Sequence, residues 1–185
     1  MVKQRIGAGL VALTLIVATS VIPRAAETAS GREIDRNVDA GLATLYARRP
    51  EAKALAQRAR GVLVFPSILK AGFLFGAQYG DGALRKKGKT VGYYNTVAAS
   101  YGLQAGLQEF GYALFFMSDS ALEYLSRTEG FEIGVGPSVV VVDEGVARTL
   151  TTTTAKDDIY AFIFDQRGLM AGLGLQGSKI TRIDR

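Results

Sequence analysis

From Gly61 to its end, the sequence consists of short apolar or alternating runs that are separated by turns containing glycine. Runs of this length and composition predict β-strands. One helix interrupts them, with Ser118 as its cap and its end near Gly130. The predicted strands are 62–65, 73–75, 91–97, 101–107, 110–117, 131–135, 139–142, 149–153, 159–164, 168–175 and 179–183. Consecutive strands without helices between them pair antiparallel, and this many strands in one domain predict a curved or closed sheet.

Two helices are predicted ahead of this body. Ser30 and Glu33 have the spacing of a capping box, and apolar residues then recur at helical intervals until Pro50, which suits the first turn of a second, short helix. The predicted fold is therefore α+β: N-terminal helices followed by a curved or barrel-like, mainly antiparallel sheet with one inserted helix. A chain of 185 residues fits one such domain, with a helical segment over 27–60 and a β-rich body over 61–185.

The first 26 residues have the pattern of a signal peptide. Lys3 and Arg5 precede an apolar run over 6–22, and Pro23 follows at once. We expect the mature chain to begin between about residues 21 and 29 and to be periplasmic or secreted. The alternative is an uncleaved anchor in the inner membrane through 6–22.

The composition excludes most catalytic chemistry. The sequence contains no His and no Cys, which removes disulfides, thiol nucleophiles, imidazole bases and nearly all zinc or copper sites. Residues 83–90 fit a permissive phosphate-loop pattern, but a strand follows them where a helix is required. Residues 172–177 spell a dinucleotide fingerprint with too little chain after it for the rest of that fold. We therefore predict no enzyme, no cofactor, no metal site and no catalytic residue.

Basic side chains gather in three places. Without Lys3, Arg5 and Arg24 of the leader, the 22 Lys and Arg fall to 19 against 17 Asp and Glu, and this near-neutral total disfavours nucleic-acid binding. Local placement then matters more than net charge. The candidate binding residues are a hairpin group of Arg85, Lys86, Lys87 and Lys89, a second group of Arg58, Arg60 and Lys70, and a third group of Lys179 and Arg182.

Several sequence blocks, spread from about residue 33 to 183, resemble the SYLF domain, also called the Ysc-type actin-binding domain. The blocks are Gly61-Val62-Leu63-Val64-Phe65-Pro66, Lys70-Ala71-Gly72-Phe73, Gly80-Asp81-Gly82-Ala83-Leu84, Gly102-Leu103-Gln104-Ala105-Gly106, and the tail from Gly168-Leu169-Met170-Ala171 through Gly177-Ser178-Lys179-Ile180. The resemblance implies a lipid-binding module. Eukaryotic members of this family bind phosphoinositide membranes and some bundle actin, whereas exported bacterial members are described as lipid-binding without a defined ligand.

These observations predict an exported, non-catalytic module that recognises anionic phospholipid or a membrane surface through its basic groups. An actin-like partner follows from the family resemblance alone, and a bacterial envelope contains no actin. Two alternatives stay open. One is an envelope structural or assembly protein that acts through protein contacts, and the other is a carrier that encloses a lipid ligand within its curved sheet.

Overall fold

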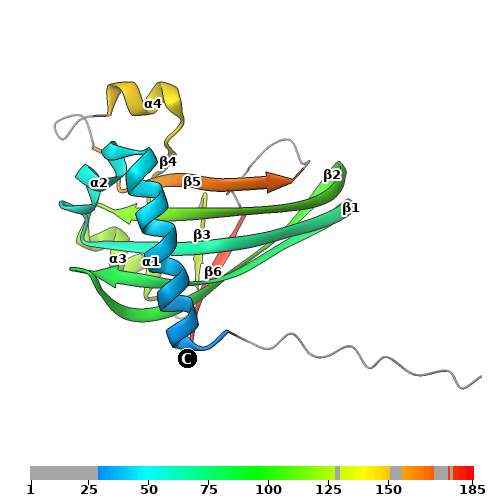
Figure 1. Cartoon of the computed structure of the whole chain (residues 1–185), viewed down its shortest axis with the longest axis horizontal. Helices are drawn as coiled ribbons and strands as arrows, with labels where there is room; N and C mark the ends of the chain where they lie inside the picture. Colours follow the sequence, from blue (N-terminus) through cyan, green and yellow to red (C-terminus); the bar gives the residue numbers. More distant parts are fainter. Residues whose placement is uncertain (1–28, 128–129, 151–155, 169–174, 176) are drawn as a thin grey trace, which may run out of the picture.

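A computed structural model describes residues 29–127, 130–150, 156–168, 175 and 177–185 of the chain (Figure 1). The predicted signal peptide over 1–26 lies outside the described residues, as does most of each predicted strand over 149–153 and 168–175. No helix among the described residues is long and apolar enough to cross a membrane.

The two N-terminal helices are present as predicted. Helix α1 covers Gly31–Arg48, and the hydroxyl of Ser30 accepts a hydrogen bond from the Glu33 N–H at 3.3 Å. Helix α2 covers Pro50–Ala56, with Pro50 in its first turn, where a missing N–H is tolerated. The buried side chains of α1 lie on one stripe, which packs against the sheet.

Two long strands form the centre of the sheet. Strand β1 covers Gly61–Lys86 and strand β2 covers Lys89–Phe116, and they pair antiparallel from Lys86↔Lys89 at the turn to Gly61↔Phe116. The shorter strands predicted within 62–117 are parts of these two. Their glycines sit at bends in continuous strands, as at the pair Gly72↔Gly106.

The remaining elements extend this hairpin into a curled sheet that forms a half-barrel. They are α3 (Asp119–Leu125), β3 (Phe131–Glu132), β4 (Val139–Val141), α4 (Glu144–Thr149), β5 (Ile159–Gly168) and β6 (Lys179–Ile183). The sheet has the order β3-β6-β2-β5-β4, with β1 paired to β2. β4 and β5 run parallel, and every other strand pair in the described part of the chain is antiparallel. The predicted fold class is confirmed: helices, then a mostly antiparallel curled sheet with an inserted helix.

One predicted strand is wrong at its start. Thr149 ends helix α4 instead of opening a strand over 149–153. The carboxylate of Asp143 caps this helix by accepting a hydrogen bond from the Val146 N–H at 2.8 Å. The inserted helix α3, in contrast, begins as predicted, because the Ser118 hydroxyl accepts from the Ala121 N–H at 3.2 Å.

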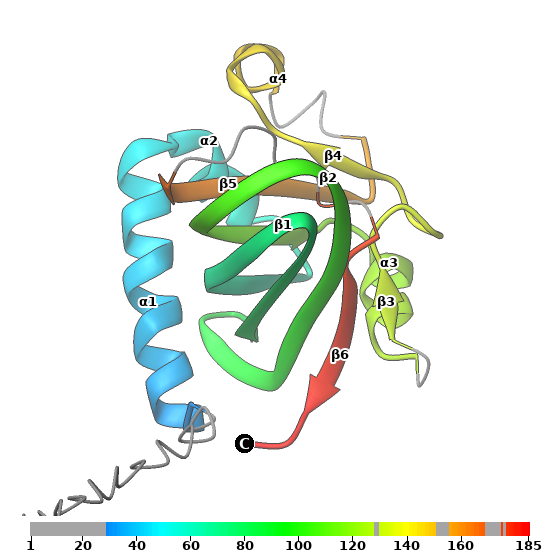
Figure 2. The ribbon, with the colours of Figure 1, turned by 90° about the vertical axis from the view of Figure 1, so that its right-hand side faces the viewer.

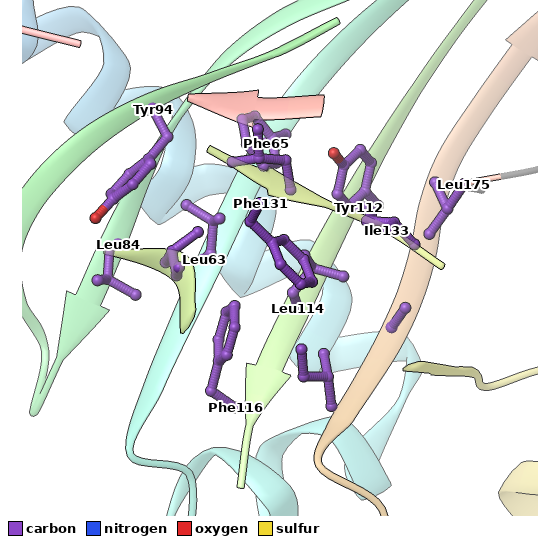
Figure 3. Packing of buried hydrophobic residues seen from close by; sticks show 14 of the residues in the cluster. Leu63, Phe65, Leu84, Tyr94, Tyr112, Leu114, Phe116, Phe131, Ile133 and Leu175 are labelled. Atoms are coloured by element: carbon purple, nitrogen blue, oxygen red, sulfur yellow. The ribbon is translucent and has the colours of Figure 1, made fainter. Parts of the chain in front are cut away.

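The sheet is covered on both faces, and each face has its own core. On the outer face, α1 and α2 pack over residues such as Val64, Phe115 and Phe162. On the concave inner face, α3 and β3 pack over residues such as Leu63 and Phe116, which point into the curl (Figure 3). Figure 2 shows α1 and the α3–β3 region on opposite sides of the curled strands.

Candidate functional site

The turn between β1 and β2 carries the predicted basic hairpin. Lys87 and Gly88 occupy the two turn positions with φ of 49° and 77°, as the tight turns of two-residue hairpins require. Lys86, Lys87 and Lys89 are exposed, and no carboxylate of a described residue forms an ion pair with them. Three ammonium groups are therefore free to contact an anionic partner.

Arg85, which was predicted with these lysines, has a different role. Its side chain is only 12% exposed, and its Nη2 lies 2.8 Å from the Asp39 carboxylate and 3.1 Å from the carbonyl oxygen of Asp35, both on α1. Asp35 also accepts hydrogen bonds from the Thr90 hydroxyl at 2.6 Å and the Tyr93 hydroxyl at 3.0 Å. Burial and this bond to Asp35 raise the pKa of Tyr93. These contacts brace the hairpin against α1.

A second basic feature is an open pocket of about 470 Å³. It is lined by Arg58, Arg60, Met117, Ser118, Lys156, Asp157 and Asp158. Its two acids already have partners: Asp158 accepts from the Ser118 hydroxyl at 3.0 Å, and Asp157 accepts from the Tyr160 hydroxyl at 3.2 Å. Arg60 lies 3.5 Å from Asp119, but both of these side chains are more than half exposed, so water screens the pair.

The pocket and the hairpin turn lie at the same end of the sheet. A Cβ added to Gly61 would lie 3.1 Å from the Leu84 side chain and 3.6 Å from the carbonyl oxygen of Arg85, so the start of β1 packs against its end. A smaller pocket of about 200 Å³ is lined by residues near Arg58 and Arg60, such as Ala59 and Val62, together with Asp39 of α1 and Lys87 of the turn. We call this region the basic end, and it comprises Arg58, Arg60, Lys86, Lys87, Lys89 and Lys156.

Lys156 is the member that sequence reasoning missed. It stands alone, directly before two acids, and nothing in its neighbourhood indicates a basic group. It reaches the pocket because β5 starts beside the end of β2, where Phe116 pairs with Ile159.

The structure separates Lys70 from Arg58 and Arg60. Lys70 is 5% exposed and lies on the inner face, opposite Gln108 of β2. A β-bulge between Phe65 and Ile68 is the reason, because one extra residue moves every later side chain to the other face of the strand. Lys70 therefore cannot contribute to a surface patch.

Lys179 and Arg182, the third predicted group, are exposed on β6. They pair with Val97 and Tyr94 of β2, and neither lines the two pockets of the basic end. Burial raises the pKa of Tyr94, and the charge of Arg182 opposes that shift. Lys179 thus lies apart from the basic end, whereas the Arg182 guanidinium comes within 3.6 Å of a Cβ built on Gly92, three residues after Lys89.

The bend midway along the hairpin, near the pair Gly72↔Gly106, exposes apolar side chains instead. Phe75 is 79% exposed and Leu107 is 60% exposed, where β1 and β2 bend beyond the reach of α1 (Figure 1). We call this region the apolar corner, and it comprises Leu69, Phe75, Tyr79, Val97 and Leu107. Sequence analysis missed it because alternation marks the apolar face of a strand but not how much of that face a helix covers.

Comparison with known proteins gives one partial match. Residues 97–184 match the model of the Ysc84 family, which is described as a Las17-binding protein actin regulator. The match begins in the second strand of the hairpin and runs through β6, so it excludes both N-terminal helices and β1. No curated protein matches the chain. The matched segment covers the C-terminal part of the region, from about residue 33 to 183, over which the sequence resembles the SYLF domain.

Proposed function

We propose that this protein is a non-catalytic binding module that recognises anionic phospholipid surfaces through its basic end, and that it does so outside the cytoplasm after removal of its leader. The observation that carries the proposal is the set of three exposed lysines without ion pairs on a braced turn, next to Arg58, Arg60 and Lys156. The match to a family described by its binding partner supports binding rather than catalysis.

The energetics favour a surface contact of this kind. A Lys or Arg near an anionic membrane surface contributes about 1 kcal/mol, and this contribution falls off within a Debye length. Because Arg85 fixes the turn to Asp35 and Asp39 of α1, the backbone of the turn needs little further ordering when the lysines bind. Several weak contacts on a rigid support then add to a useful, salt-sensitive affinity.

The test is co-sedimentation of the purified chain with vesicles of phosphatidylcholine alone and with added phosphatidylglycerol, at low and high salt. We expect binding to the anionic vesicles that high salt weakens. The K86Q/K87Q variant should bind about thirtyfold more weakly, since it loses about 2 kcal/mol.

The matched control is R167Q/K179Q, which removes the same charge from two exposed positions away from the basic end. This control should bind almost as well as the unchanged chain. Equal losses in the two variants would show that net charge matters and the basic end does not. Absence of vesicle binding under every condition would reject the proposal and favour a protein partner instead.

The proposed export and removal of the leader are tested separately. N-terminal sequencing of the chain recovered from the periplasm of a bacterial host should show a mature protein that begins between about residues 21 and 29. Retention of Met1 in a membrane fraction would support the uncleaved anchor instead.

A further inference from the structure

The larger pocket of the basic end is built where three segments of the chain meet. Its volume of about 470 Å³ lies within the range of ligand pockets, roughly 300–1,000 Å³. The Arg60 N–H donates to the Phe116 carbonyl oxygen at 2.7 Å, and the Met117 N–H donates to the Asp158 carbonyl oxygen at 2.8 Å. These backbone bonds tie the segments before β1 and before β5 to the end of β2, so hydrogen bonds fix the walls of the pocket.

The two acids of this pocket differ in how far the fold uses them. Oδ1 of Asp158 accepts from the Ser118 hydroxyl at 3.0 Å, and its Oδ2 accepts from the Ser138 N–H at 3.3 Å and the Ser138 hydroxyl at 3.4 Å. Asp157 accepts through Oδ2 from the Tyr160 hydroxyl at 3.2 Å, and in the described part of the chain its Oδ1 accepts no hydrogen bond. A carboxylate can accept several hydrogen bonds, so Asp157 has capacity for another donor.

Cations line the same pocket as Asp157 without pairing with it. Arg58, Arg60 and Lys156 are among its lining residues, yet Asp157 forms no ion pair with any described residue. Lys156 forms neither an ion pair nor a hydrogen bond with them. The pocket thus offers positively charged N–H donors and a carboxylate acceptor that do not satisfy one another. A ligand that carries both signs of charge would contact both.

We propose that this pocket binds a phosphoethanolamine group, in which a short ethylene link joins a phosphate to a primary ammonium. The phosphate oxygens accept from Lys156 and Arg60, and the ammonium donates to Asp157. A simple anion would lie beside the like charge of Asp157, which lowers its affinity. A choline group has no N–H to donate and is typically bound by aromatic rings, and none of the described residues that line this pocket is aromatic.

This inference rests on the proposed function, because the cations of the pocket belong to the basic end, but the two can fail separately. The exposed lysines of the turn attract any anionic surface, whereas the pocket distinguishes one head group from another. K86Q/K87Q should therefore weaken binding to anionic vesicles and leave the affinity for a soluble head group unchanged. D157N should keep the salt-dependent binding to anionic vesicles.

The test is isothermal titration calorimetry of the full chain with glycerophosphoethanolamine, glycerophosphocholine and glycerophosphoglycerol. All three probes carry a phosphate diester, and only the first also carries an ammonium with N–H donors. We expect glycerophosphoethanolamine to bind at least tenfold more tightly than either of the others. D157N should remove this preference by weakening the binding of glycerophosphoethanolamine at least tenfold and not that of glycerophosphoglycerol. K156Q should weaken the binding of both.

The matched control is D184N, which removes the same charge at an exposed position that lines neither pocket of the basic end. It should bind every probe as the unchanged chain does. The amide oxygen of D157N can still accept from the Tyr160 hydroxyl, so the two variants should have similar thermal midpoints. The proposal is overturned if glycerophosphoethanolamine does not bind, if glycerophosphoglycerol binds as tightly, or if D157N weakens the binding of both probes alike.

Vesicles then distinguish a lipid head group from a free small molecule as the source of the phosphoethanolamine group. Co-sedimentation at high salt, which screens the lysines of the turn, compares phosphatidylcholine vesicles with and without added phosphatidylethanolamine. Stronger binding with phosphatidylethanolamine identifies the lipid as the ligand. Equal sedimentation with both vesicles, together with tight binding of the soluble probe, identifies a free small molecule.

Discussion

The basic end and the apolar corner are two regions of one folded hairpin, and they are built in opposite ways. The turn and the open end of the hairpin both lie at the basic end, and the apolar corner lies at the bend midway along its strands. At the basic end, the strands join through an open turn whose Gly88 would accept a Cβ with no atom within 4 Å. At the apolar corner, a Cβ on Gly72 would collide with the backbone of Phe75 and Gly76. The turn is loosely surrounded and charged, and the corner is tightly folded and apolar.

This difference shows what decides the character of each end. The outer face of the hairpin is apolar along much of its length, but α1 covers it only toward the basic end (Figure 1). Where α1 lies, apolar side chains become core, and charges are found at the rim. Where α1 does not reach, the same face remains exposed.

The largest expected effect is a difference in stability between alanine variants at Gly72 and at Gly88. Gly72→Ala should lower the free energy of unfolding by about 3 kcal/mol or more, because backbone atoms cannot yield to the new Cβ. Gly88→Ala should cost only about 1 kcal/mol, since its φ of 77° is strained for alanine but its surroundings are open. Urea denaturation of both variants measures the two losses of unfolding free energy. Equal losses would contradict the contrast between a tight corner and an open turn.

A smaller, pH-dependent effect comes from Tyr112, which lies in β2 between the apolar corner and the open end of the hairpin. Burial raises the pKa of its phenol well above the ordinary value of 10.0. A group whose pKa is higher in the folded state stabilises the fold below its unfolded pKa and loses that stabilisation as the pH rises. Unfolding free energy should therefore fall by up to about 1.4 kcal/mol per pH unit above 10.

Tyr112→Phe should remove this part of the alkaline loss, at the cost of the bond to Thr96 at lower pH. Denaturation curves of both proteins between pH 8 and 11.5 provide the comparison. Parallel pH profiles would mean that the Tyr112 hydroxyl ionises as easily in the folded protein as in the unfolded chain.

The smallest effect on stability is expected at the apolar corner. F75S/L107S replaces side chains that are already 79% and 60% exposed, so the free energy of unfolding should change by less than about 0.5 kcal/mol. Salt-dependent vesicle binding should persist, while any binding that survives high salt should decrease, because the corner offers apolar contacts only. If the double variant instead lost the salt-dependent part, the basic end would not be the main contact.

Local signals predicted the helices and the turn well. Ser30, Pro50 and Ser118 mark helix starts through short-range capping, which depends only on neighbouring residues. The cap at Asp143 carries the same kind of signal, although no helix was predicted there. The hairpin turn was likewise evident from glycine and charge between two apolar runs.

Features that depend on contacts between distant segments could not be predicted from the sequence. The bulge after Phe65 reverses which face Lys70 occupies, and a single sequence does not show where a bulge falls. Arg85 looks like its neighbouring lysines until α1 places Asp35 and Asp39 beside it. Lys156 joins the basic end only because β5 begins beside β2. In each case another segment of the chain decides the role of the residue.

The nested pairing of β1 and β2 also bears on how the chain reaches its native state. Pairs at the Lys87–Gly88 turn join residues close in sequence, and pairs at the open end, such as Gly61↔Phe116, join residues far apart. Closing short loops first costs the least chain entropy, so we expect the hairpin to zip from its turn outward. Helix α1 emerges before the hairpin during synthesis, yet its anchors Arg85 and Thr90 lie at that turn. The docking of α1 therefore depends on the hairpin turn, which is translated after the helix.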